Sequence, residues 1–83
     1  MVIGDFKEGM AKVRVGNKYG FINTIGEITI PINLDYCEDF NNGHALIKVN
    51  ELWGAINKNG EVKIDPVYKY EEAKKLIEKI NGS

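Results

Sequence analysis

The chain repeats itself with a period of 34 residues. Shifted by that distance, residues 5–38 align with residues 39–72 without a gap, and thirteen of the 34 positions are identical. Ordinary residue usage would give roughly two or three identities by chance. A fixed period of this length is typical of one supersecondary unit used in tandem. The sequence therefore predicts a single small repeat domain with units 5–38 and 39–72.

The first part of each unit has the signals of two β-strands. Apolar and polar side chains alternate through residues 11–15 and 45–49, which indicates a strand with one buried and one largely wet face. The next strand in each unit carries a glycine directly after an aromatic residue, at Gly20 and Gly54. Glycine inside a strand indicates a bulge, or another backbone lying close against it.

A third strand follows in each unit, over residues 27–30 and 61–64, and a proline comes shortly after it. Asn59-Gly60 before the second of these strands predicts a type I′ hairpin. Proline lacks a backbone donor, so it ends the pairing. We therefore expect a mainly-β fold made of two tandem three-stranded antiparallel meanders.

The repeat ends after residue 72, and an amphipathic pattern replaces it. Apolar residues recur at helical spacing, Glu71 and Glu72 stand in the first turn, and Lys79 stands near the end. The pattern predicts a helix over about 70–81. Because terminal units of repeat proteins need a cover, we expect this helix to cap the stack.

The recurring residues form one long motif: Asp-Phe-x-x-Gly-x-Ala-x-Val, then Tyr/Trp-Gly-x-Ile-Asn, then Gly-Glu-x-x-Ile-x-Pro. This motif resembles the bacterial WG repeat, also called KWG, over residues 5–72. Tyr19 stands where the family has its tryptophan. The resemblance implies a β-rich repeat fold used for binding or display, and it carries no catalytic residue. The motif positions are Phe6, Gly9, Tyr19 and Gly20 in the first unit, and Phe40, Gly43, Trp53 and Gly54 in the second.

Charge and composition narrow the class of partner. The chain has 11 basic and 12 acidic residues, so no surplus of positive charge is present to neutralise a run of phosphates. This argues against nucleic acid as the main partner. No apolar stretch reaches the ~20 residues that span a bilayer, so we expect no membrane partner. The single cysteine and the absence of a signal-peptide pattern predict a cytoplasmic protein.

The sequence offers no catalytic constellation. An enzyme needs a nucleophile with its base, an acid–base pair or a metal cage, and the chain has one histidine, one cysteine and one serine. We interpret His44 as a solvated turn residue, and Cys37 beside two acidic residues as an inert thiol. Asp35, Glu38 and Asp39 do not match the spacing of a calcium loop. We predict no catalytic residue, no metal and no cofactor.

The aromatic residues are the main candidates for binding, because they recur at equivalent places. Core packing between the units is the interpretation we favour for Phe6, Phe40, Tyr19 and Trp53. The alternative is an aromatic-lined groove with basic partners from the strands. The candidate ligand-binding residues are Arg14, Lys12, Lys48, Trp53, Tyr19 and Tyr36.

We predict a non-enzymatic interaction module that binds another protein through its β-sheet face. One alternative is a protein that sequesters a small anionic ligand such as a nucleotide, which basic residues around a cavity would favour. The other is a carbohydrate-binding module, which coplanar exposed rings would favour. The end of the stack opposite the helix is left open, so a homodimer is also predicted.

Overall fold

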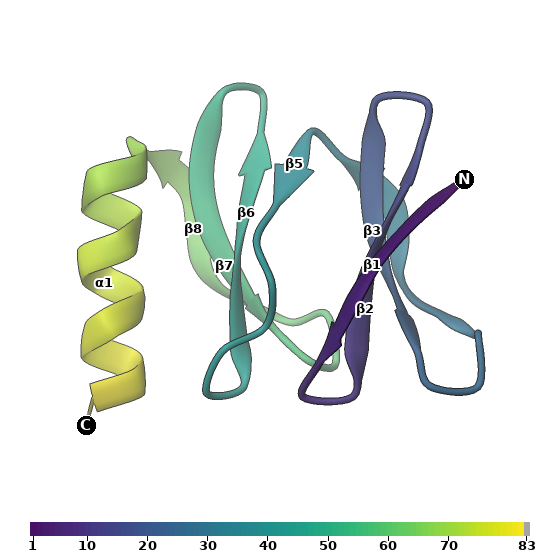
Figure 1. Cartoon of the computed structure of the whole chain (residues 1–83). Coiled ribbons are helices and arrows are strands. Elements are labelled where there is room, and N and C mark those ends of the chain that lie inside the picture. Colours follow the sequence, from purple (N-terminus) through teal and green to yellow (C-terminus); the bar gives the residue numbers. More distant parts are fainter. Residues whose placement is uncertain (83) are drawn as a thin grey trace.

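The structure is a computed structural model that describes residues 1–82, and it contains two antiparallel sheets followed by one helix (Figure 1). The predicted mainly-β fold is confirmed. Sheet 1 consists of β1 (Val2–Lys7), β2 (Met10–Val15), β3 (Lys18–Asn23) and β4 (Ile28–Leu34). Sheet 2 consists of β5 (Tyr36–Cys37), β6 (His44–Val49), β7 (Leu52–Asn57) and β8 (Val62–Tyr68), and α1 spans Tyr70–Gly82.

Each sheet has four strands, one more than the meander predicted from the sequence. The added strand is β1 in sheet 1 and β5 in sheet 2, and both lie at a sheet edge. Asp5 and Phe6 belong to β1, and the turn that follows is confined to Glu8 and Gly9, with φ angles of 54° and 80°. The 34-residue shift carries β2, β3 and β4 onto β6, β7 and β8, residue for residue. The repeat is therefore a repeat of whole sheets.

The two sheets and α1 form successive layers along the chain (Figure 1). Residues from both sheets meet in the main core between them: Met10, Phe21, Ile30 and Leu34 from sheet 1, Cys37, Ala45, Ile47 and Ile56 from sheet 2, and Phe40 from the segment between β5 and β6. The face of β2 that the alternation marks as wet thus points partly inward, since Met10 on it is only 7% exposed. Stacking against a second sheet therefore buries part of this face as well.

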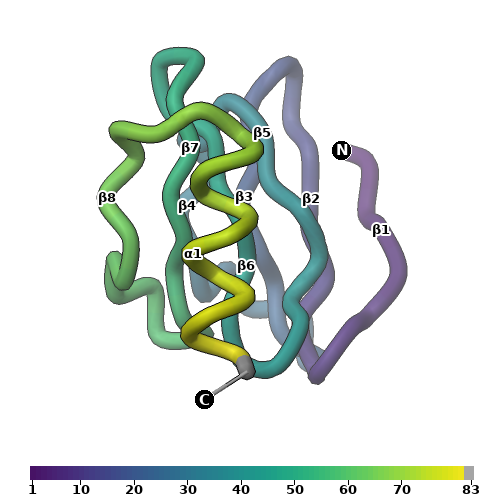
Figure 2. Tube along the Cα trace, turned by 90° about the vertical axis from the view of Figure 1, so that its left-hand side faces the viewer, coloured from purple at the N-terminus to yellow at the C-terminus, as the bar shows by residue number. Residues whose placement is uncertain are grey.

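Helix α1 caps sheet 2, as the sequence predicts (Figure 2). Its Ala73 and Ile77 are buried against Leu46, Ala55 and Ile64 of the sheet, and Leu76 packs at the margin of this cluster. Ile80 at the end of the amphipathic pattern is 37% exposed. The helix therefore covers the outer face of sheet 2 mainly through its first two turns and its middle.

Gly20 and Gly54 mark a close approach of two backbones. A Cβ at Gly54 would lie 2.3 Å from the carbonyl oxygen of Ile64, and one at Gly20 would lie 2.6 Å from that of Ile30. The strand pairing is irregular at both places, as β4 and β8 bulge over the glycines. The expectation drawn from glycine inside a strand is confirmed, and it explains why an aromatic-glycine pair recurs.

The turn at Asn59-Gly60 is not the type I′ hairpin that the sequence suggests. A type I′ turn needs positive φ at both central residues, and here Gly60 has φ of 83° whereas Asn59 is not among the residues with positive φ. The side chain of Asn57 accepts hydrogen bonds from the backbone N–H groups of Asn59 and Glu61, at 3.0 and 2.9 Å. Asn57 thus closes a wider turn, and Asn23 does the same in the first unit.

Candidate functional site

The outer face of sheet 1 is an apolar surface at the free end of the stack. A bulge in β1 sets Ile3 opposite Val13 and Phe6 opposite Ala11, so both β1 side chains lie on one face. Ala11, Val13 and Ile22 form a buried cluster on this face. We call the exposed residues around that cluster, Ile3, Phe6 and Val15, the end surface.

The same positions are covered in the second unit. Ile3 and Phe6 are 51% and 48% exposed, whereas their counterparts Cys37 and Phe40 are 0% and 3% exposed. Val15 is 44% exposed, and its counterpart Val49 packs against the core between the sheets. Among residues 1–82, sheet 2 lies against one face of sheet 1, and no sheet lies against the other. Placing Phe6 in the core was therefore wrong, while Phe40 is in the core.

Four aromatic rings form a row that runs from sheet 1 through sheet 2 to the helix. Tyr19, Tyr36, Trp53 and Tyr70 follow one another every 17 residues, half the repeat period. Their successive ring centroids are 5.1, 6.0 and 4.9 Å apart, and the ring planes cross at 73–76°. Edge-to-face packing of this kind stabilises aromatic pairs. We call this set the aromatic row.

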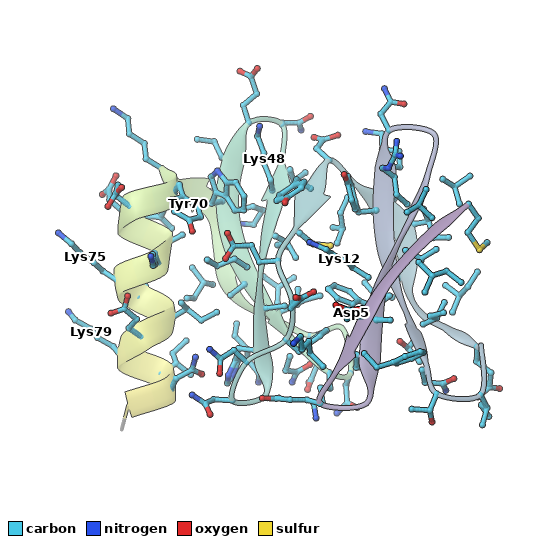
Figure 3. The ribbon with its side chains drawn as sticks, viewed as in Figure 1. Asp5, Lys12, Lys48, Tyr70, Lys75 and Lys79 are labelled. Carbon is cyan, nitrogen blue, oxygen red and sulfur yellow. The ribbon has the colours of Figure 1, made fainter. Side chains whose placement is uncertain are left out.

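Basic side chains flank the aromatic row. The ammonium of Lys12 lies 5.4 Å from the ring centroid of Tyr36, and that of Lys74 lies 5.9 Å from the centroid of Tyr70. Lys48 pairs across the strands with Tyr36 and Trp53. In Figure 3, Tyr70 and Lys48 lie toward the same end of the molecule, and Lys75 and Lys79 point away from the sheets. The row and its cations therefore form a set of internal contacts across the layers.

Arg14 and Lys48 do not form a common basic site. Its guanidinium donates a hydrogen bond to the carbonyl oxygen of Gly16, at 3.0 Å, in the turn that follows its own strand. It pairs across the strands with Tyr19 in sheet 1, whereas Lys48 is in sheet 2. Lys12 and Tyr36 both line one hollow.

That hollow is open, has a volume of about 670 Å³ and lies between the β1–β2 turn and the segment after β5. Its lining residues are Lys7, Glu8, Lys12, Tyr36, Glu38, Asp39, Phe40 and Asn41. Three carboxylates and two ammonium groups face it, so it does not concentrate positive charge.

Two carboxylates tie the first unit to the second. Glu8 accepts hydrogen bonds from the backbone N–H groups of Asn42 and Gly43, at 2.5 and 2.8 Å, and the bond from Gly43 is the main cause that lowers the Glu8 pKa. At the other end of the strands, Asp35 pairs with Lys18 and accepts from the N–H of Asn50, and the bond from Lys18 chiefly lowers its pKa.

The acidic set noted in the sequence is dispersed. Asp35 contacts Lys18 at the start of β3 and the backbone of Asn50 in the turn after β6. Glu38 instead accepts a 2.9 Å hydrogen bond from the hydroxyl of Tyr70. That bond, together with burial, raises the Tyr70 pKa. Among residues 1–82 no three His, Cys, Asp or Glu side chains gather as metal ligands do.

The groups considered for catalysis have structural partners. Burial raises the pKa of the Cys37 thiol to about 12, so the nucleophilic thiolate is suppressed. His44 begins β6, where its Nδ1 lies 3.0 Å from the side-chain oxygen of Asn81 on α1. Within the described part of the chain, no helix is long and apolar enough to cross a membrane.

Comparison with known families decides the classification. The sequence profile of the family described as WG containing repeat matches three consecutive segments, residues 2–19, 19–53 and 53–73. The chain belongs to the WG repeat family. No curated protein and no solved structure matches it.

The family's segments meet at Tyr19 and Trp53, the first residues of the two aromatic-glycine pairs. The middle segment covers one full repeat of the WG pattern, and the outer two are shorter. Each sheet of the structure therefore draws its four strands from two neighbouring WG segments. This sharing fixes each repeat to the next.

Sequence reasoning missed the roles of Tyr70, Glu38 and Glu8. Tyr70 stands at the start of the predicted helix, and the structure shows it to be the fourth ring of the aromatic row. The 17-residue spacing of the rings was the available signal, because it runs through the end of the repeats into the helix. Glu8 gave no signal, since its counterpart is Asn42 and its bonds are to backbone.

Proposed function

We propose that this WG repeat chain is a non-enzymatic interaction module that binds another protein through the outer face of sheet 1. The observation that carries the proposal is the difference in exposure between equivalent positions. Ile3 and Phe6 are half exposed, where the same repeat positions in sheet 2 are buried. Large apolar side chains grouped on an open sheet face are typical of a protein interface.

The other surfaces support this choice by elimination. The inner faces of both sheets and the outer face of sheet 2 are occupied by neighbouring layers. The end surface is the sheet face that remains open in the described chain, so a partner that recognises a sheet face meets it there.

The small-ligand alternative draws on the hollow beside Lys12 and Tyr36. Glu8, Glu38 and Asp39 in its lining oppose an anion such as a nucleotide, because like charges repel at close range. The carbohydrate alternative draws on the aromatic row. Its ring planes cross at 73–76°, so successive rings do not form the flat platform on which a sugar stacks. Both alternatives therefore have weaker support than the end surface.

Site-specific photocrosslinking tests the proposed function. A photoreactive phenylalanine analogue is placed at position 6, and matched controls carry it at position 67 or position 75. Val67 is 61% exposed on β8, in the other sheet. Lys75 lies on the exposed side of α1.

Irradiation of cells that produce the chain should give a discrete protein adduct from position 6 and none from the two controls. If position 6 gives no adduct, or if all three positions give the same adducts, the end surface is not the interface.

A further inference from the structure

The repeat shows what kind of surface covers this face. In sheet 2 the equivalent face packs against another antiparallel sheet. The ring centroids of Phe40 and Phe21 lie 4.6 Å apart there, and the ring planes cross at 63°. Phe6 holds the equivalent position in sheet 1 and has no ring partner among residues 1–82. A sheet face that offers apolar side chains, an aromatic ring among them, is therefore the fitting occupant.

We infer that this occupant is a second copy of the chain, in a two-fold dimer that packs one end surface against the other. The inference rests on the proposed function and adds the identity of the partner. The opposite end of the stack cannot serve, because α1 covers the outer face of sheet 2. A contact between identical surfaces closes after two copies and does not continue into a filament.

The charges on this face are compatible with a contact between identical surfaces. A two-fold axis brings each group near its own copy, so an unpaired charge at the centre would meet a like charge. Ile3, Phe6 and Val15 are apolar, and the neighbouring Lys18 is held in an ion pair with Asp35. The face therefore carries no unpaired charge at its centre.

The edge strand β1 gives a second reason. It pairs only with β2, so its outer edge is open, and open edges in natural sheets are covered or blunted. A dimer that covers the end surface would place the second copy beside this edge as well as over Ile3 and Phe6.

Sedimentation equilibrium of the full chain over a range of concentrations up to about 100 µM tests the inference. Wild type should reach twice the 9.3 kDa mass of one chain. Phe6→Asp removes a ring from each side of the contact, so the dissociation constant should rise at least about 100-fold, as at an interface hot spot. Val67→Asp, the matched control at an exposed apolar residue on β8 of sheet 2, should leave the mass as in wild type. Ile3→Lys serves as a second variant, and circular dichroism verifies that each variant is folded.

A wild type that stays at the monomer mass up to about 100 µM overturns the inference. So does a dimer that persists in both Phe6→Asp and Ile3→Lys, or one that Val67→Asp disrupts equally. The failure is distinguishable from failure of the proposed function. A monomer whose position 6 still crosslinks to a protein of another mass retains the function and loses only the second copy.

Discussion

Replacement of Gly54 by alanine probes the feature that defines the repeat, the close crossing of strands at the aromatic-glycine pair. The added methyl would lie 2.3 Å from the carbonyl oxygen of Ile64 and 2.7 Å from the nitrogen of Pro66. Ordinary contacts begin at 3.4 Å, so β8 would have to move by about 1 Å relative to β7. Both contacts are to backbone atoms, and no flexible side chain can yield instead.

Overpacking of this kind costs about 3 kcal/mol. A domain of this length has a free energy of unfolding of about 4–12 kcal/mol, so the loss is a large part of it. The midpoint of thermal unfolding should fall by roughly 15 °C or more in circular dichroism. Gly20→Ala should behave alike, since its Cβ would meet the oxygen of Ile30 at 2.6 Å.

Gly9→Ala is the matched control. Gly9 has φ of +80°, and no atom lies within 4 Å of the place that a Cβ would take, so alanine there meets backbone strain alone. That strain costs about 1–2 kcal/mol. If Gly54→Ala lowers stability no more than Gly9→Ala does, the close crossing of backbones is not the reason for glycine, and this explanation of the motif fails.

Three further substitutions or treatments test the polar and buried groups. Glu8→Ala should lower the free energy of unfolding in urea at neutral pH by about 1 kcal/mol, because two backbone N–H groups lose their acceptor. The control Glu78→Ala, on the exposed side of α1, should stay within about 0.5 kcal/mol of wild type. The pKa of Glu8 in the folded chain lies below its ordinary value of 4.5, so the stability that Glu8 contributes is complete above pH 4.5 and is lost as the pH falls through the folded pKa. If Glu8→Ala lowers the free energy of unfolding equally at neutral and at strongly acidic pH, this explanation is wrong. Tyr70→Phe removes the hydrogen bond to Glu38 and should cost about 1 kcal/mol in the same assay, and no loss would mean that the bond adds nothing. The Cys37 thiol should react with a disulfide reagent at pH 8 only as fast as the chain unfolds, since burial raises its pKa to about 12; rapid labelling of the folded chain would show that the thiol is accessible.

The period of 34 residues predicted the three strands that recur in each sheet, because β6, β7 and β8 repeat β2, β3 and β4 at the same register. The glycine after Tyr19 and Trp53 also revealed its cause, since few other reasons put glycine inside a strand. The capping helix followed from the loss of the repeat and the change of apolar spacing.

The fourth strand was missed because β1 lies at the very start of the chain and its counterpart β5 is only two residues long. Phe6 was misplaced because a repeat gives equivalent residues the same sequence signal, whether or not a neighbouring unit is present to cover them. The position of a unit within the stack, and not its local sequence, decides that exposure. For the same reason the sequence alone could not separate the end surface from the core.

The most direct test of the end surface is the labelling rate of a thiol placed on it. Ile3→Cys puts a thiol at an exposed position, while the native Cys37 at the equivalent position is fully buried and stays silent. The account predicts that labelling at position 3 slows at least about tenfold as the concentration rises into the dimer range. A Lys75→Cys control on α1 should keep a constant rate. A rate at position 3 that is independent of concentration, like that of the control, would contradict the account.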